Sequence, residues 1–257
     1  MCYDDTARPP YPPGASGTAR GEDIVLTAAD GNRLAAYAAH LVRPASAQVA
    51  IFGDARGLGP FYKELALRFA EVGIAAVAID YYGRTAGLTA HDASFEFMPH
   101  LNQLKLQGLL ADTAAALAYL RAGAGRERAT FTLGFCMGGA LSFLNGTSDA
   151  GLAGAIGFYA FSGTAAFFDD RSFLDSAEQI TWPVLGLFGD ADKVIPVSDV
   201  HTFDEKLDRA GVEHEITIYP GAPHGFFEIQ QAEYAEASAD AWKRVLDFIN
   251  VHTRSPS

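Results

Sequence analysis

The sequence predicts a doubly wound α/β fold, in which helices cover both faces of a mostly parallel sheet. Short apolar runs alternate along the chain with longer segments of helical periodicity, as strand–helix–strand units require. The run at 74–80 (IAAVAID) is apolar almost throughout, which is typical of a strand buried on both faces. Hydrophobic residues make up 49% of the 257 positions and charged residues 19%, so the chain can bury a large core.

The expected elements follow one another in a regular order. Residues 1–21, rich in Pro, Gly and Ala, are expected to form an extended arm, and residues 22–257 a single domain. The segments 24–29 and 33–42 flank a strong turn signal, Asp30-Gly31-Asn32, and predict an antiparallel hairpin at a sheet edge. The further strands expected are 48–52, 74–80, 129–133, 153–160, 183–189 and 214–219, and the helices are 60–72, 103–121, 139–145, 198–210 and 231–251. The long connections 83–102 and 161–182 are candidate lids or walls of a site.

Composition and charge narrow the class of partner. The formal net charge is −12, which repels phosphate backbones and anionic lipid surfaces, so neither nucleic acid nor a membrane is an expected partner. No run approaches 18 apolar residues, and the N-terminus lacks the apolar stretch of a signal peptide. Two cysteines, Cys2 and Cys136, are too few for a disulfide framework and fit a reducing compartment, the cytoplasm. A monomer or small homo-oligomer is expected.

In doubly wound sheets, ligands bind beyond the carboxyl ends of the strands, and the sharpest motif lies at such an end. Residues 134–139 (GFCMGG) place Cys136 between a strand and a helix with the G-x-nucleophile-x-G spacing of a nucleophile elbow. Glycines two residues before and after the nucleophile relieve collisions in that tight turn. The helix N-terminus favours the thiolate of Cys136, and the Met137 amide then faces a developing oxyanion. The alternative is a buried structural cysteine.

A second strand end supplies carboxylates. Residues 188–192 (FGDAD) close a strand and lead through 194–196 (VIP) into a helix. A carboxylate here can orient a histidine and stabilise its imidazolium, and we assign that role to Asp192. Asp190 is expected to bond the backbone of the turn. The alternative is that both carboxylates only build the turn.

A third strand end supplies the base. His224 lies in the Gly/Pro-rich loop 219–226 after the last expected strand, whereas the six other histidines fall at surface or helix positions. The order nucleophile, acid, histidine is that of the α/β-hydrolase fold, which we therefore predict. The alternative is a surface histidine. The sequence shows no metal-ligand spacing and no phosphate-binding glycine loop, so neither a metal nor a cofactor is expected.

At this point the chain resembles the dienelactone hydrolase family. The resemblance lies in the segments 1–4 (MCYD), 52–57 (FGDARG), 78–84 (AIDYYGR), 134–139, 189–196 and 223–226 (PHGF). A cysteine in the elbow is its most specific mark, because most hydrolases of this fold carry serine there. The resemblance implies an α/β-hydrolase that cleaves a lactone or ester.

The family also implies roles for the loop after the third strand. Its members carry Glu at the place of Asp54, and that carboxylate pairs with the resting cysteine until substrate binds. The amide of the next residue, Ala55, would supply the second oxyanion donor. Asp54 is one methylene shorter than Glu. The alternative is that Asp54 caps its turn or pairs with Arg56.

The family binds a substrate carboxylate with two arginines, and this chain departs from that pattern. One arginine matches Arg84, but the other position holds Glu228, which would repel a carboxylate. Arg56 is a candidate to compensate. The departure weighs against dienelactone itself as the substrate. The alternative role for Arg84 is an ion pair with Asp80 or with the acidic surface.

These residues predict a hydrolase of a small ester or lactone, with or without a carboxylate. Cys136 would attack the carbonyl, and His224 would protonate the leaving alkoxide and then activate water. Further candidates for lining the substrate site are Tyr82 and the aromatic residues Phe161, Phe226 and Phe227. Two alternatives stay open: a carboxylesterase of the same fold that acts on simple neutral esters, and a non-catalytic redox-sensing or binding protein with a reactive cysteine.

Overall fold

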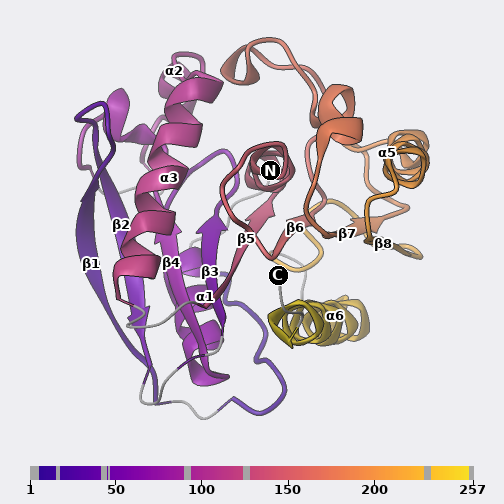
Figure 1. Ribbon diagram of the computed structural model, residues 1–257, viewed down its shortest axis with the longest axis horizontal. Helices are drawn as coiled ribbons and strands as arrows, with labels where there is room; N and C mark the ends of the chain where they lie inside the picture. The colour runs from indigo at the N-terminus through magenta and orange to yellow at the C-terminus, as the bar shows by residue number, and fades with distance from the viewer. Residues whose placement is uncertain are drawn as a thin grey trace.

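A single mixed sheet organises the molecule. The computed structural model describes residues 6–15, 18–41, 45, 47–89, 94–123, 128–228 and 233–254. Within these ranges, eight strands lie in the order β1-β2-β4-β3-β5-β6-β7-β8 (Figure 1). The strands are β1 (Arg20–Thr27), β2 (Arg33–His40), β3 (Ala47–Phe52), β4 (Ile74–Ile79), β5 (Ala129–Phe135), β6 (Gly154–Phe158), β7 (Val184–Gly189) and β8 (His214–Tyr219).

The pairing confirms the predicted fold class. β1 runs antiparallel to β2, and β2 antiparallel to β4, whereas every other neighbouring pair is parallel. The central strands β3 and β7 are buried at every position, which explains their continuous apolar runs. The parallel strands all end at one edge, and the loops that leave this edge carry the candidate site.

Helices cover both faces of the sheet (Figure 1). On one face lie α1 (Pro60–Glu71) and α6 (Ala235–Arg254), and on the other lie α3 (Leu106–Ala122), α4 (Met137–Asn145) and α5 (Val197–Ala210). Shorter elements are α2 (Phe97–Leu101) and the 3₁₀ turns η1 (Tyr82–Arg84), η2 (Ala166–Phe168) and η3 (Phe173–Gln179). Among the helices described, none combines the length and apolar character needed to cross a bilayer.

The structure differs from the expected elements at two places, and hydrogen bonds explain each difference. The first strand begins at Arg20 rather than at residue 24, because it pairs with the whole of β2. The connection 161–182 is not featureless: Ser172 opens η3 with a capping box, in which its side chain accepts from Leu174 N and Asp175 accepts from Ser172 N. The S-x-x-D pattern at residues 172–175 is the sequence feature that indicates this capping box.

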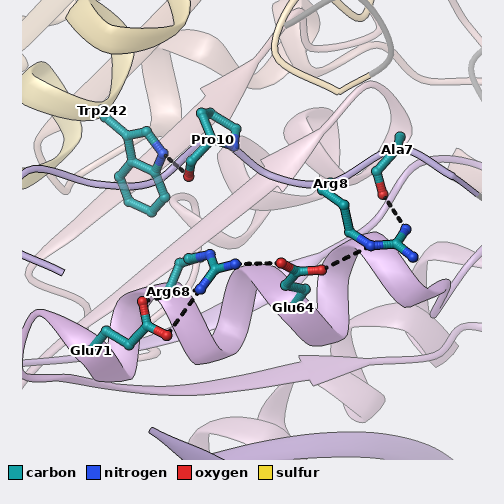
Figure 2. Close-up of polar contacts among 7 residues, drawn as sticks. All are labelled: Ala7, Arg8, Pro10, Glu64, Arg68, Glu71 and Trp242. Carbon is teal, nitrogen blue, oxygen red and sulfur yellow. Dashed lines mark hydrogen bonds and ion pairs between the residues drawn. The ribbon is translucent and has the colours of Figure 1, made fainter. Parts of the chain in front are cut away.

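In the N-terminal arm, the described residues 6–15 lie across α1 and α6 and form no helix or strand, whereas residues 20–21 already belong to β1 (Figure 2). Trp242 Nε1 of α6 donates to Pro10 O at 2.9 Å. Arg8 pairs with Glu64 of α1 at 3.2 Å, and Glu64 also pairs with Arg68 (Figure 2). The arm therefore joins two helices on the same face. Residues 1–5, with Cys2 and the first segment of the family resemblance, lie outside the described residues, as do positions 231–232 of the last expected helix.

Candidate active site

Cys136 occupies a strained turn between β5 and α4. Its backbone has φ 52° and ψ −115°, a conformation that L-residues rarely adopt and that is concentrated at functional sites. A Cβ at Gly134 would lie 1.9 Å from Gly138 O, and a Cβ at Gly138 would lie 2.3 Å from Phe52 O. Both glycines are therefore required sterically, as the G-x-nucleophile-x-G spacing predicts.

The elbow also fixes the first turn of α4 against the loop that follows β3. Gly138 approaches the carbonyls of Phe52 and Gly53 so closely that no side chain fits between them. Met137 is the first residue of α4, and the first four amides of a helix have no acceptor within it. The Met137 amide and the loop containing Ala55 thus lie on adjoining segments, the arrangement expected of two oxyanion donors.

Three tyrosines hold the loop 53–55, one at each residue. Tyr81 donates its hydroxyl to Gly53 O at 2.7 Å. The hydroxyl oxygen of Tyr62 accepts from Asp54 N at 2.8 Å, and Tyr82 donates to Ala55 O. Tyr81 follows the end of β4, Tyr62 lies in α1, and Tyr82 lies in η1. We call Tyr62, Tyr81 and Tyr82 the tyrosine clamp; it fixes the backbone that presents the Ala55 amide.

His224 and Asp192 meet across the ends of β8 and β7. His224 Nδ1 lies 2.7 Å from Asp192 Oδ2, with the Asp192 side chain 1% exposed and that of His224 9% exposed. The other carboxylate oxygen of Asp192 accepts from Val194 N at 2.7 Å and Ile195 N at 3.0 Å. The loop backbone therefore orients the carboxylate, and the carboxylate orients the imidazole.

Asp190 lies two residues earlier and has a different partner. Its Oδ1 accepts from Gly221 N at 2.5 Å, which ties the end of β7 to the loop that carries the histidine. The exposed Asp190 thus bonds backbone, whereas the buried Asp192 bonds the histidine ring. This division agrees with the roles assigned from their order in the sequence.

Tyr159 connects the cysteine turn with the histidine. It follows β6 with φ 35°, again in the left-handed region, and its ring centroid lies 4.9 Å from that of His224. The carbonyl oxygen of the preceding residue, Phe158, accepts a hydrogen bond from Cys136 N at 3.0 Å. Phe161 N donates to Cys136 O, also at 3.0 Å. The end of β6 therefore contacts both members of the proposed pair.

Asp54 is buried and caps its own turn. Its Oδ1 accepts from Arg56 N at 2.8 Å, and its carbonyl accepts from Gly57 N at 3.1 Å. This is the turn-capping role that the sequence left open. A carboxylate has two oxygens, so capping by Oδ1 is compatible with a role toward Cys136 as well.

Arg84 forms a structural ion-pair cluster. Its guanidinium bonds Asp112 at 2.8 and 3.0 Å and Asp30 at 2.6 and 3.3 Å. Asp112 is buried and also accepts from Asn32. The partners differ from Asp80, which the sequence suggested, because the β1–β2 turn and α3 bring Asp30 and Asp112 to η1. A substrate carboxylate would have to compete with both, so the geometry favours the structural alternative.

Three other predicted substrate-site residues, Phe226, Tyr82 and Arg56, each make contacts within the protein. Phe226 is fully buried against Phe158 and Tyr219, so it is part of the core rather than a wall of the site. Tyr82 is equally buried and acts on the loop through Ala55 O. The guanidinium carbon of Arg56 lies 5.2 Å from the centre of the Phe97 ring, a cation–π contact.

Glu228 has a partner set that sequence reasoning missed. It is buried and accepts from the hydroxyls of Tyr62 and, at 2.8 Å, Tyr159. The sequence placed Tyr62 only in the expected helix 60–72 and Tyr159 only in the expected strand 153–160. A buried carboxylate requires donors, and tyrosines are the donors an otherwise apolar region can supply. The unusual Glu at position 228 was the available signal.

Asp80, at the end of β4, is a second buried carboxylate. It accepts from Leu58 N at 3.3 Å and Tyr82 N at 3.1 Å. Burial raises the pKa of Asp80 to about 7, against the lowering effect of these bonds. The Asp80 carboxyl group therefore titrates near neutral pH. In the sequence it directly precedes Tyr81 and Tyr82, two members of the tyrosine clamp.

Fold and strand-end residues together define an α/β-hydrolase. A solved structure of a Klebsiella pneumoniae subsp. pneumoniae protein described as a dienelactone hydrolase has the same fold, with a TM-score of 0.79 and 24% identity over 91% of this chain and 99% of that one. The model of the dienelactone hydrolase family matches residues 34–253. The chain therefore belongs to the dienelactone hydrolase family and is a carboxylic ester hydrolase.

Two relatives illustrate the similarity in sequence. A protein of Yersinia pestis named as a carboxymethylenebutenolidase is 27% identical over 199 residues, which cover 76% of this chain and 74% of that protein. A protein of Bradyrhizobium sp. named as a 2-oxo-3-(5-oxofuran-2-ylidene)propanoate lactonase is 28% identical over 225 residues, 86% of this chain and 90% of that protein.

Proposed function

We propose that the chain hydrolyses a small ester or lactone through a Cys136–His224–Asp192 triad and a thioester acyl-enzyme. The observation that carries this proposal is the 2.7 Å contact between His224 Nδ1 and Asp192 Oδ2, at the sheet edge where Cys136 holds the elbow conformation. Family membership supports the reaction class. The names of the two relatives, a butenolidase and a lactonase, support a lactone among the substrates.

The first half of the cycle forms the acyl-enzyme. His224 takes the thiol proton of Cys136, and the thiolate Sγ attacks the acyl carbonyl carbon, whose oxygen becomes an oxyanion held by the amides of Met137 and Ala55. When this intermediate collapses, the bond to the leaving oxygen breaks and His224 gives that oxygen a proton. In a lactone, the resulting hydroxyl stays tethered to the acyl chain.

The second half releases the acid. His224 takes a proton from water, and the hydroxide attacks the thioester carbon. The carbon–sulfur bond then breaks, so Cys136 leaves as thiolate and the carboxylic acid departs. Asp192 stays ionised throughout and stabilises the imidazolium that forms in each half. Asp54 is proposed to pair with Cys136 in the resting enzyme.

Charge around the site favours a substrate without a carboxylate. The two positions that would hold a substrate carboxylate carry Glu228 and an Arg84 already bonded to two aspartates. Asp54 adds a further buried acidic group in the loop before Arg56. A second anion would be repelled by these carboxylates most strongly where water is excluded. We therefore propose a neutral ester or lactone.

Replacing the nucleophile tests the triad, with the second cysteine as a matched control. Cys136→Ala is expected to lose p-nitrophenyl acetate hydrolysis by on the order of 10³-fold or more, because no thioester can form. Cys2→Ala is expected to retain it. Mass spectrometry of the acid-quenched wild type should show an acetyl group on Cys136. Full activity in Cys136→Ala would overturn the proposal.

A pair of substrates tests the charge preference. We expect a higher kcat/KM for a five-membered lactone than for the same lactone bearing a carboxylate. Arg56→Gln should change neither rate strongly, because Arg56 contacts Phe97. A preference for the carboxylate-bearing lactone that disappears in Arg56→Gln would reject the neutral substrate and assign Arg56 as the ligand.

A further inference from the structure

Tyr62 and Glu228 connect the loop after β3 with the loop that carries His224. Both side chains are buried, with residue exposures of 3% and 4%. Glu228 N donates to Gly225 O at 3.0 Å, so this carboxylate belongs to the same turn as the histidine. A buried polar group that loses its partner is destabilising, so their bonds restrain both loops.

The bonds form a continuous bridge from the oxyanion loop to the histidine. Asp54 N donates to the Tyr62 hydroxyl oxygen at 2.8 Å, and Tyr62 donates its own proton to Glu228 Oε1. The second oxygen, Oε2, accepts from Tyr159 at 2.8 Å. The Tyr159 ring lies 4.9 Å from the His224 ring, between centroids. We call this set the Tyr62–Glu228–Tyr159 bridge.

The direction of each bond requires a carboxylate at position 228. Tyr62 has one proton, and its oxygen already accepts from Asp54 N, so its partner at 228 must accept. Tyr159 likewise donates. A glutamine would offer one accepting oxygen and one NH₂ group, so only one tyrosine bond could persist unchanged. Burial, with the nearby Asp54 and Glu228 carboxylates, raises the pKa of Tyr62, which keeps its hydroxyl protonated.

We infer that Tyr62 and Glu228 are positioning residues for acylation, which hold the Ala55 amide in a fixed place relative to His224. The inference rests on the proposed function, since it takes Ala55 as an oxyanion donor. The other tyrosines of the clamp fix Gly53 and Ala55 from the β4 side, and Tyr62 continues to the histidine loop through Glu228. Removing a whole oxyanion donor costs about 10²–10³-fold in rate, so displacing one should cost less.

Tyr62→Phe tests the inference, with Tyr219→Phe as the matched control. Tyr219 also donates to a carboxylate, that of Asp240 at 2.9 Å, but outside the bridge. We expect Tyr62→Phe to acylate on p-nitrophenyl acetate about 10–100-fold more slowly than wild type. Alkylation of Cys136 by iodoacetamide should be unchanged, because that displacement uses the thiolate but creates no oxyanion. Tyr219→Phe should match wild type in both reactions.

A second variant and a second readout keep the test decisive. Glu228→Gln should likewise show slower acylation and unchanged alkylation. This variant replaces Tyr62→Phe in the test if Tyr62→Phe does not fold. Wild type should prefer an oxo ester over its thiono analogue, and this preference should shrink in both variants because sulfur accepts N–H weakly. Equal losses in acylation and alkylation, or no loss in acylation, would overturn the bridge. If Cys136→Ala still hydrolyses the ester, the proposed function fails instead.

Discussion

Two halves of the sheet edge use acidic residues in opposite ways. Beyond β7 and β8, Asp192 bonds His224 and Asp190 bonds the loop backbone, so each carboxylate has the bonding partner that its place in the chain suggested. Beyond β3 and β4, charged groups bond one another and the protein framework: Arg84 bonds Asp30 and Asp112. The comparison teaches that residue order identifies the chemistry of a strand end, but it does not identify ion pairs between distant elements.

The largest effect is expected in the histidine half. Asp192→Asn preserves the shape of the side chain but removes the charge that holds His224 in the working tautomer. We expect kcat/KM for p-nitrophenyl acetate to fall on the order of 10²–10⁴-fold, with the folded structure retained by circular dichroism. An Asp192→Asn enzyme within tenfold of wild type would show that the two halves do not differ in catalysis.

In the β3–β4 half, a large effect is expected on stability rather than on rate. Arg84→Gln leaves Asp112, whose side chain is 1% exposed, without its cation, which should lower the free energy of unfolding by about 3–5 kcal/mol. Asp30→Asn breaks the more exposed pair of the same guanidinium and should lower stability much less than Arg84→Gln. Urea titration measures both.

Arg84→Gln also sharpens the comparison through its activity. Per folded molecule, hydrolysis of a neutral ester should stay near the wild-type rate in Arg84→Gln. If Arg84→Gln is instead as stable as wild type and loses activity only toward carboxylate-bearing esters, Arg84 is a substrate ligand and the contrast between the halves fails.

Asp80 adds a pH dependence to the β3–β4 half. Because its folded pKa of about 7 lies above the unfolded value, its contribution to stability is present at low pH and falls as pH rises from about 4 to 7. Asp80→Asn cannot titrate, so its unfolding free energy relative to wild type should rise by up to about 3 kcal/mol between pH 5 and pH 8. Urea titrations of both proteins at the two pH values measure it; a constant difference would exclude a raised pKa.

The smallest effect separates the two neighbouring aspartates. Asp190→Ala removes the bond to Gly221 N and should lower stability by about 1 kcal/mol, with kcat/KM reduced a few-fold at most. Thermal unfolding and steady-state rates check it beside Asp192→Asn. A catalytic loss in Asp190→Ala as large as that of Asp192→Asn would assign both carboxylates to the histidine.

How far the sequence predicts this molecule depends on how local each signal is. Backbone sterics and chain direction determine the elbow glycines, the apolar strand runs and the order Cys136, Asp192, His224. All of these features were predictable from the sequence. The partners of Arg84 and Glu228 were not, because Asp112 and Tyr62 lie far from them in the chain and reach them only through packing. Phe226 was placed in the substrate site for the same reason: proximity to His224 in sequence does not say which way a ring points.

The N-terminal arm has a consequence for the order in which the chain is completed. The bond between Trp242 Nε1 and Pro10 O joins positions 232 residues apart. During synthesis on the ribosome, Pro10 is therefore made 232 residues before its partner Trp242. The arm can pair with α1 through Arg8 and Glu64 earlier, but its bond to α6 must wait until Trp242 has been made, so that contact is a late event in folding.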